Sequence, residues 1–181
     1  MSSESNRPPE APAAPDDDMT DPLAGDQLTS DRRQSAAAAA ISRGVRRLLS
    51  GHGLTSVTEL ALPNGRRADV VGIDPKGIVW IVEIKSSIED FRADSKWPDY
   101  REFCDHLLFA VAPDFPVEIL PDDTGLIIAD RFGGELIRPA PLHPLNASRR
   151  RSFVLRLTRT AMARLHRIED PDRSLESRLR E

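Results

Sequence analysis

The chain has 181 residues, of which 39% are hydrophobic, and a formal net charge of −4 at pH 7. This length suits one domain with a sizeable core, and no apolar run is long enough to span a membrane. The single cysteine, Cys104, excludes an internal disulfide. Because residues 1–4 also lack the basic and apolar regions of a signal peptide, we expect a cytoplasmic globular protein.

Acidic side chains are concentrated at the start of the chain. Residues 1–30 contain seven acids and one arginine, which leaves 24 Lys and Arg against 22 Asp and Glu in residues 31–181. The overall negative charge is therefore no argument against nucleic acid as a partner. Residues 1–28 are rich in Pro, Ala, Asp and Ser without apolar periodicity, so we predict a disordered tail there.

Helical spacing begins after Ser30, a residue type that caps helices. The apolar residues that recur at this spacing are Ala37, Ala40, Ile41, Val45, Leu48 and Leu49. We predict a helix over residues 30–52 that packs on a sheet. Its other face carries Arg43, Arg46 and Arg47, which fits either a solvated surface or a clamp on DNA.

Two turns of one type define the strands that follow. The segment Asp74-Pro75-Lys76-Gly77-Ile78 places Asp, Pro and Gly where a type I turn followed by a left-handed residue requires them. Leu62-Pro63-Asn64-Gly65-Arg66 repeats the pattern. Each segment predicts a three-residue hairpin loop with a bulge at the glycine. Residues 55–87 therefore form an antiparallel three-stranded meander in which Leu62 pairs with Arg66 and Asp74 with Ile78.

The register of these loops predicts a row of carboxylates. Counting back from the two turns places Asp69 opposite Glu83 and Glu59 opposite Asp69, all on one face of the sheet. Neighbouring Cβ atoms in such a row lie about 5 Å apart. Carboxylates at this spacing repel one another, so either their pKa values rise or a cation lies among them. Hard divalent ions such as Mg²⁺ or Mn²⁺ prefer oxygen ligands.

Lys85 lies two residues after Glu83 and therefore projects from the same face. In this position it can hold an attacking water or a phosphate oxygen, and the register places Arg67 opposite it as part of a positive ledge. The alternative is a simple ion pair between Glu83 and Lys85 at a solvated strand end. That pair leaves Asp69 and Glu59 unexplained, so metal chemistry accounts for more of the pattern.

Local patterns also predict the rest of the chain. Pro98 fits the first turn of a short helix that ends near Cys104, and residues 106–112 indicate a buried strand. Residues 125–129 and 135–138 predict a closing hairpin.

Asn146 is expected to cap a last helix that continues to about Ile168, before a flexible tail over residues 169–181. The predicted buried stripe of this helix consists of Phe153, Leu157, Ala161, Leu165 and Ile168. Its arginines fit a solvated face or phosphate contacts, and they are Arg149, Arg150, Arg151, Arg156, Arg159, Arg164 and Arg167.

Asp69 followed by Glu83-Ile84-Lys85 resembles the D…(D/E)xK signature of the PD-(D/E)XK nuclease superfamily. Further segments resemble the MmcB-like family of bacterial DNA repair nucleases over roughly residues 30–168: Gly65-Arg66-Arg67-Ala68-Asp69, Val82-Glu83-Ile84-Lys85-Ser86-Ser87, Asp90-Phe91, Asp94, Lys96-Trp97, Tyr100, Cys104-Asp105 and Gly125-Leu126-Ile127-Ile128-Ala129-Asp130.

The resemblance implies an α/β (α+β) fold with a restriction-endonuclease-like core. In such a core a central mixed sheet, with its antiparallel meander, is flanked by the N-terminal and C-terminal helices. It also implies DNA as the substrate, Asp69 and Glu83 as metal ligands, and Lys85 as the catalytic lysine. Ala68 stands where the signature has proline. In the superfamily the additional acid often comes from the first helix, which leaves the role of Glu59 open.

Side chains around the carboxylates are candidate substrate contacts, and they are Arg43, Arg46, Arg67, Ser86, Ser87, Lys96, Trp97 and Tyr100. Asp94, Lys96, Trp97 and Tyr100 fit helix caps and surface packing equally well. The four histidines are scattered, and no zinc motif, Walker loop or nucleophile elbow occurs.

Three functions remain open. The first is a Mg²⁺- or Mn²⁺-dependent DNA endonuclease of the bacterial cytoplasm, located on the nucleoid when bound to DNA. The second is a DNA-binding repair accessory protein that does not cleave. The third is an interaction module in which the charged row is structural. A homodimer or a complex with other repair proteins is compatible with each.

Overall fold

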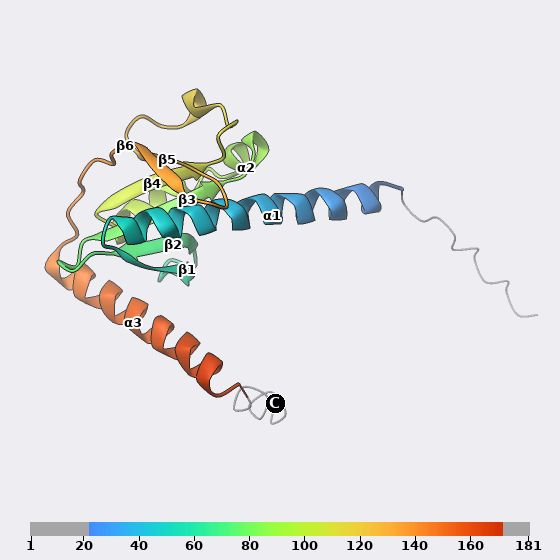
Figure 1. Ribbon diagram of the computed structural model, residues 1–181. Helices are drawn as coiled ribbons and strands as arrows, with labels where there is room; N and C mark the ends of the chain where they lie inside the picture. Colours follow the sequence, from blue (N-terminus) through green and yellow to red (C-terminus); the bar gives the residue numbers. More distant parts are fainter. Residues whose placement is uncertain (1–21, 172–181) are drawn as a thin grey trace, which may run out of the picture.

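The computed structural model of the chain describes residues 22–171, with side chains described from Ala36 onward. Its centre is a six-stranded mixed sheet in which the strands lie side by side in sequence order (Figure 1). The strands are β1 (Thr55–Ala61), β2 (Arg67–Ile73), β3 (Val79–Lys85), β4 (His106–Val111), β5 (Gly125–Ala129) and β6 (Gly134–Arg138). Together with its flanking helices, this sheet confirms the fold class predicted from the sequence.

The first three strands form the predicted meander. The N–H of Leu62 donates to the carbonyl of Arg66 at 2.8 Å, and that of Asp74 donates to the carbonyl of Ile78 at 3.1 Å. Gly65 and Gly77 have φ values of 79° and 81°, in the left-handed region that the turns require. Both predicted loops, with their registers, are therefore confirmed.

β3, β4 and β5 are parallel neighbours, and β6 pairs antiparallel to β5. Three short helices carry the two parallel crossovers, namely α2 (Ile88–Ala93), η1 (Trp97–Phe103) and η2 (Val117–Ile119). The sequence predicted η1 from Pro98 but not α2. Ser87 caps α2 by accepting a hydrogen bond from the Asp90 N–H at 3.1 Å, so the polar segment after β3 forms a helix through capping rather than through an apolar stripe.

The helices cover both faces of the sheet. In α1 (Pro22–Gly51), Ile41, Val45 and Leu49 pack against one face. On the opposite face, side chains of η1 and α3 (Ala147–Glu169) form a second cluster with residues of the first four strands. The sheet is therefore buried on both sides. None of the helices within residues 22–171 combines the length and the apolar character needed to cross a membrane.

α1 begins at Pro22, eight residues before the predicted start at Ser30. Proline suits the first turn of a helix because its missing N–H has no partner there. The helix thus includes residues 22–28, which the sequence assigned to the tail. The remaining tail residues, 1–21 and 172–181, lie outside the described part of the chain.

α1 lies directly against the β5–β6 turn. A Cβ atom at Gly44 would collide with the carbonyl oxygens of Asp130 and Gly133, so only glycine permits this approach. The guanidinium of Arg47 donates to the carbonyls of Arg131 and Phe132 at 2.8 and 2.9 Å. These contacts fix the position of α1 across the sheet, and with it the position of the arginines on its free face.

The buried stripe predicted for α3 is only half correct. Asn146 caps the helix as predicted, by accepting a hydrogen bond from the Arg149 N–H at 2.8 Å. Phe153 and Leu157 are buried, but Leu165 and Ile168 are 51% and 77% exposed. Figure 1 shows the reason, since the second half of α3 extends away from the sheet. Periodicity identifies an apolar face, but not the length of the surface that covers it.

Candidate active site

The ladder between β2 and β3 ends at the pair Val70–Val82, and two carboxylates continue it. The Asp69 carboxylate accepts a hydrogen bond from the Ile84 N–H at 2.8 Å, and the Glu83 carboxylate accepts one from the Asp69 N–H at 3.3 Å. Each acid therefore bonds to the backbone of the strand opposite. The register predicted from the turns brings Asp69 and Glu83 side by side.

A cavity of about 730 Å³ opens at this end of the sheet. Of the twelve site residues predicted from the sequence, the nine that line it are Arg43, Arg46, Glu59, Arg67, Asp69, Glu83, Lys85, Ser86 and Tyr100. α1 contributes the two arginines, together with the short side chains of Ala38, Ala39 and Ser42. The small residues keep α1 from filling the space above the carboxylates.

Three predicted contacts lie outside the cavity lining. Ser87 caps α2, the Lys96 N–H donates to the Asp94 carboxylate at 3.0 Å, and Trp97 packs edge-on against Phe109. For Lys96 and Trp97 these are the capping and packing roles that the sequence allowed as alternatives, whereas the cap at Ser87 was not predicted.

Glu59 does not complete the predicted row of three acids. Its φ of 50° is left-handed, and both Val57 and Leu60 pack toward the same core cluster. Residues three apart on a regular strand face opposite sides, so β1 changes face at Glu59, and Leu60 occupies the buried position. The Glu59 side chain is 63% exposed and lies 3.8 Å from the guanidinium of Arg67.

Two contacts hold this irregular backbone in place. The guanidinium of Arg164 on α3 donates to the carbonyls of Thr58 and Glu59. A pattern of residues within β1 carries no signal for a contact from a helix about 100 residues later. Within the described residues, no group of three or more His, Cys, Asp or Glu side chains is arranged to hold a metal ion.

Burial dominates the electrostatics of the two remaining acids. It raises the pKa of Glu83 to about 8, with a further contribution from the charge of Asp69. It also raises the pKa of Asp69, despite the hydrogen bond from Ile84. Tyr100 donates its hydroxyl hydrogen to the Arg67 carbonyl at 3.2 Å, and burial and the nearby carboxylates raise its pKa as well. The cavity therefore disfavours negative charge unless a cation enters it.

The stability of the metal-free protein should consequently depend on the protonation of Glu83. A carboxyl group with a raised pKa binds its proton more tightly in the folded state, so its stabilisation is present below pH 4.5 and is lost as the pH rises toward about 8. The difference corresponds to at most roughly 5 kcal/mol. In EDTA, we expect Glu83→Gln to be more stable than wild type at pH 8, by a margin that shrinks toward pH 5.

Urea unfolding at several pH values measures this margin. The exposed Glu118 offers a matched control, since Glu118→Gln removes a carboxylate outside the cavity lining and should change stability by less than about 0.5 kcal/mol at every pH. A Glu83→Gln margin that is the same at pH 5 and pH 8 would contradict the buried-acid interpretation.

Lys85 pairs with Asp94, an acid to which the sequence assigned either a capping role or a place at the substrate site. Its buried ammonium lies 2.5 Å from the carboxylate of Asp94, which follows α2 directly. Burial raises the pKa of Asp94, but the hydrogen bonds from Lys85 and from the Lys96 N–H together lower it below its ordinary value. The positive ledge expected from Arg67 and Lys85 is not formed as such, because each cation has a carboxylate partner.

Asp90 is a further acid in the cavity lining that was not predicted as a site residue from the sequence. Its carboxylate accepts hydrogen bonds from the N–H and hydroxyl of Ser86 at 3.0 and 3.2 Å. The spacing of Ser87 and Asp90 is that of a capping box, which is the signal that could have indicated both this helix start and the acid.

The donor set of the cavity fits one hard divalent cation. Mg²⁺ is commonly held by one or two carboxylates and keeps several waters, which leaves it free to contact phosphate. Asp69 and Glu83 supply two such carboxylates at one end of an open cavity. Burial is the main cause of both raised pKa values, and the charge of Asp69, which adds to the pKa of Glu83, is the part that a bound cation would offset.

Comparisons with known proteins agree with the sequence resemblance. A family model described as "DNA repair protein MmcB-like" matches residues 25–172. Among solved structures, the SPO1766 protein of unknown function from Silicibacter pomeroyi is 42% identical, with a TM-score of 0.73. The match covers 75% of this chain and 93% of that one. No curated protein matches the chain.

Proposed function

The chain belongs to the MmcB-like family of DNA repair proteins, and from this premise we propose that it is a metal-dependent DNA nuclease. The observation that carries the proposal is the cavity in which two buried or half-buried carboxylates, Asp69 and Glu83, lie beside the buried ammonium of Lys85. A pair of acids with raised pKa values in an open cavity is typical of a functional site.

Asp69 and Glu83 would hold the ion, Mg²⁺ or Mn²⁺. When bound, such an ion lowers the pKa of a bound water and neutralises charge that grows on the phosphate. Lys85 would donate a hydrogen bond to the water or to a phosphate oxygen. Its ion pair with Asp94 holds the ammonium in one position, which is the preorganisation that such a role requires.

Positive charge on the wall of the cavity supports DNA as the substrate. Arg43 and Arg46 are exposed on α1, and Arg67 is exposed on β2, where it lies 3.8 Å from the equally exposed Glu59. Guanidinium groups bind phosphate oxygens through two parallel hydrogen bonds. They therefore offer contacts to the backbone on either side of the bond that is cleaved.

A second candidate function is DNA binding in repair without cleavage. The displacement of Glu59 favours it, because two acids rather than three remain buried together. A site with fewer carboxylates binds a divalent ion more weakly. The same arginines would then serve binding alone.

Incubation of the purified protein with plasmid, single-stranded and branched DNA tests both functions. With Mg²⁺ or Mn²⁺ we expect cleavage that EDTA stops, that Glu83→Ala abolishes, and that the matched surface variant Glu118→Ala retains. Cleavage that persists in Glu83→Ala would refute the proposed site. Salt-sensitive binding of DNA without cleavage by the wild type would instead favour the accessory function.

A further inference from the structure

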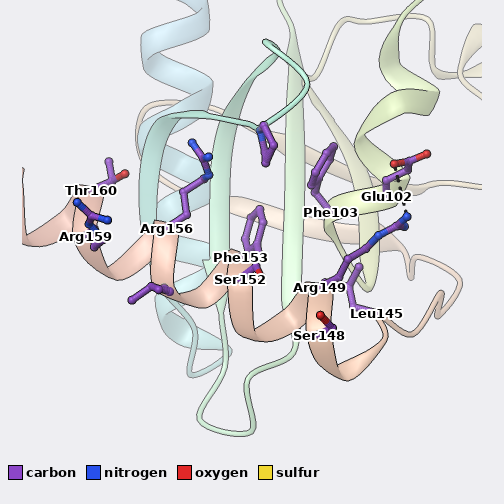
Figure 2. A pocket seen from close by; sticks show the side chains of 12 residues that line it. Glu102, Phe103, Leu145, Ser148, Arg149, Ser152, Phe153, Arg156, Arg159 and Thr160 are labelled. Carbon is purple, nitrogen blue, oxygen red and sulfur yellow. Dashed lines mark ion pairs between the residues drawn. The ribbon is translucent and has the colours of Figure 1, made fainter.

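A second hollow lies on α3, away from the candidate active site. It has a volume of about 560 Å³ and shares no lining residue with the cavity of Asp69 and Glu83. Its floor includes Phe103 of η1 and Phe153 of α3. Figure 2 shows Arg149, Arg156 and Arg159 spaced along α3 beside this floor. We call this hollow the α3 groove.

The α3 groove carries a net positive charge. Glu102 is the acid in its lining, and it lies 3.9 Å from Arg149, with both side chains more than half exposed. Arg156 donates to the carbonyl of Ala61 at 3.5 Å. This acceptor is neutral, so the charge of Arg156 is not balanced by a carboxylate there. Within residues 36–171, neither Arg156 nor Arg159 has an ion-pair partner. Within the described residues, the groove therefore presents two guanidinium groups, those of Arg156 and Arg159, without a carboxylate partner.

We propose that the α3 groove binds the phosphate backbone of DNA beyond the cleaved bond. The inference rests on the proposed function for the binding of DNA, but not for its cleavage. Arg149 and Arg159 are ten residues apart, which on a helix is about 15 Å, or roughly four steps of one DNA strand at 3.4 Å each. The hydroxyls of Ser148, Ser152 and Thr160 line the same groove and are of the kind that donates to phosphate.

The groove combines arginines with an apolar floor that is partly covered, since Leu155 is exposed and Phe103 is half-buried. Phe153 and Leu145 are 5% and 9% exposed, because they already pack in the core of this chain. A protein helix that docks through an apolar face could bury Leu155 and part of Phe103, but it would also have to cover three guanidinium groups. A DNA backbone needs little such surface, since its contacts are mostly to charged and polar groups.

Two elements connect the α3 groove to the candidate active site. η1 contributes Tyr100 to the cavity, and Glu102 and Phe103 to the groove. The β1–β2 hairpin contributes Arg67 to the cavity and Pro63 to the groove. The two hollows thus meet the same hairpin and the same short helix, and we expect DNA that leaves the cavity over this hairpin to contact the groove.

The test compares two double variants that remove the same charge. Arg156→Gln/Arg159→Gln alters the groove, whereas Arg131→Gln/Arg151→Gln alters exposed arginines that line neither hollow. Affinity for a 30-base-pair duplex is measured by fluorescence anisotropy at a series of salt concentrations in EDTA. We expect the groove variant to reduce the magnitude of the slope of log K against log salt concentration by about two and to weaken binding at least about tenfold. The control should match the wild type.

Two further variants guard against loss of folding. Arg159→Gln alone should reduce the magnitude of the salt slope by about one. Arg156→Lys/Arg159→Lys should retain most of the wild-type slope, because lysine still contacts phosphate as a point charge. An unchanged slope in the groove variant, or an equal loss in the control, overturns the proposal. The proposal would also be overturned if the groove variant bound DNA like the wild type but lost the wild type's binding to a polyglutamate peptide. That result would favour an acidic protein segment as the partner.

Failure of the α3 groove proposal can be distinguished from failure of the nuclease proposal. Binding is measured without metal, so a protein that binds DNA through the groove but never cleaves it would refute the nuclease and retain the groove. A protein that cleaves DNA with an unaltered salt slope in the groove variant would refute the groove alone. A wild type without salt-sensitive DNA binding would refute this inference directly.

Discussion

Replacement of Asp69 by Asn is expected to lower DNA cleavage by about a hundredfold to a thousandfold, the scale for loss of one group that stabilises transition-state charge, with DNA affinity equal or higher. Asn keeps a carbonyl oxygen that can accept the hydrogen bond from the Ile84 N–H, which Asp69 accepts at 2.8 Å. The substitution therefore removes one of the two acids that would hold the ion without disrupting the strand end.

The affinity should not fall, because the substitution removes negative charge from a cavity that faces phosphate. Burial raises the pKa of both acids, to about 8 for Glu83, so in EDTA the substitution removes any negative charge that Asp69 carries and adds none. Titration of duplex DNA in EDTA measures the affinity, and a plasmid assay with Mg²⁺ measures cleavage.

Asp114 is exposed on the loop after β4 and provides the matched control. Asp114→Asn removes the same charge and should leave both measurements unchanged. If Asp69→Asn cleaved DNA at the rate of the wild type, the ion would have to be held elsewhere and the assignment of the cavity would be wrong. A marked loss of affinity would mean that the carboxylate positions the DNA itself.

The second large effect is expected at Asp105, where substitution should destabilise the fold by about 3–5 kcal/mol. Its side chain has no exposed surface and accepts hydrogen bonds from the N–H groups of Val79 and Leu145 at 2.8 and 2.9 Å. The guanidinium of Arg150 adds two further bonds at 2.7 and 2.8 Å. One carboxylate thus joins the starts of β3, β4 and α3.

Burial raises the pKa of Asp105, but the bonds from Arg150, Val79 and Leu145 outweigh it and lower the pKa below its ordinary value. The charged form is therefore the one that stabilises the fold. This contribution is present at neutral pH and is lost as the pH falls through the lowered pKa. Asp105→Asn removes the charge and leaves Arg150 without its partner.

Urea unfolding at pH 7 tests this expectation. Asp123 supplies the control, because it pairs with Arg101 at 2.5 Å but is 67% exposed. The loss of an exposed pair such as this one costs at most about 1 kcal/mol, so Asp123→Asn should have a small effect. Similar losses in the two variants would show that the Asp105 network contributes no more than a surface ion pair.

The turns and strands of the meander could be read from local sequence. A glycine at the end of each loop accepts a left-handed conformation that other residues avoid, and Gly65 and Gly77 adopt it as predicted. Since side chains alternate along a strand, the turn with Gly77 was enough to bring Asp69 beside Glu83. The rules involved connect residues only a few positions apart.

The rest of the candidate site depends on contacts between distant segments. Glu59 leaves the predicted row because Leu60 takes the buried position and Arg164 of α3 holds the backbone there. Lys85 meets Asp94 only because α2 forms after β3 and returns that acid to the end of the strand. Neither the displacement of Glu59 nor the pairing of Lys85 can be predicted from the residues next to it in the sequence.

The sequence by itself therefore determined the two turn registers of the meander, the Asn146 cap of α3, and the adjacency of the two central acids. The tertiary structure alone decided that the third acid is displaced, that the lysine is paired, and that half of the apolar face of α3 is exposed. It also decided that the arginines of α3 line a groove with η1. The physical reason is range, because turn sterics act within a few residues, whereas the length of a covered surface depends on how all the elements pack.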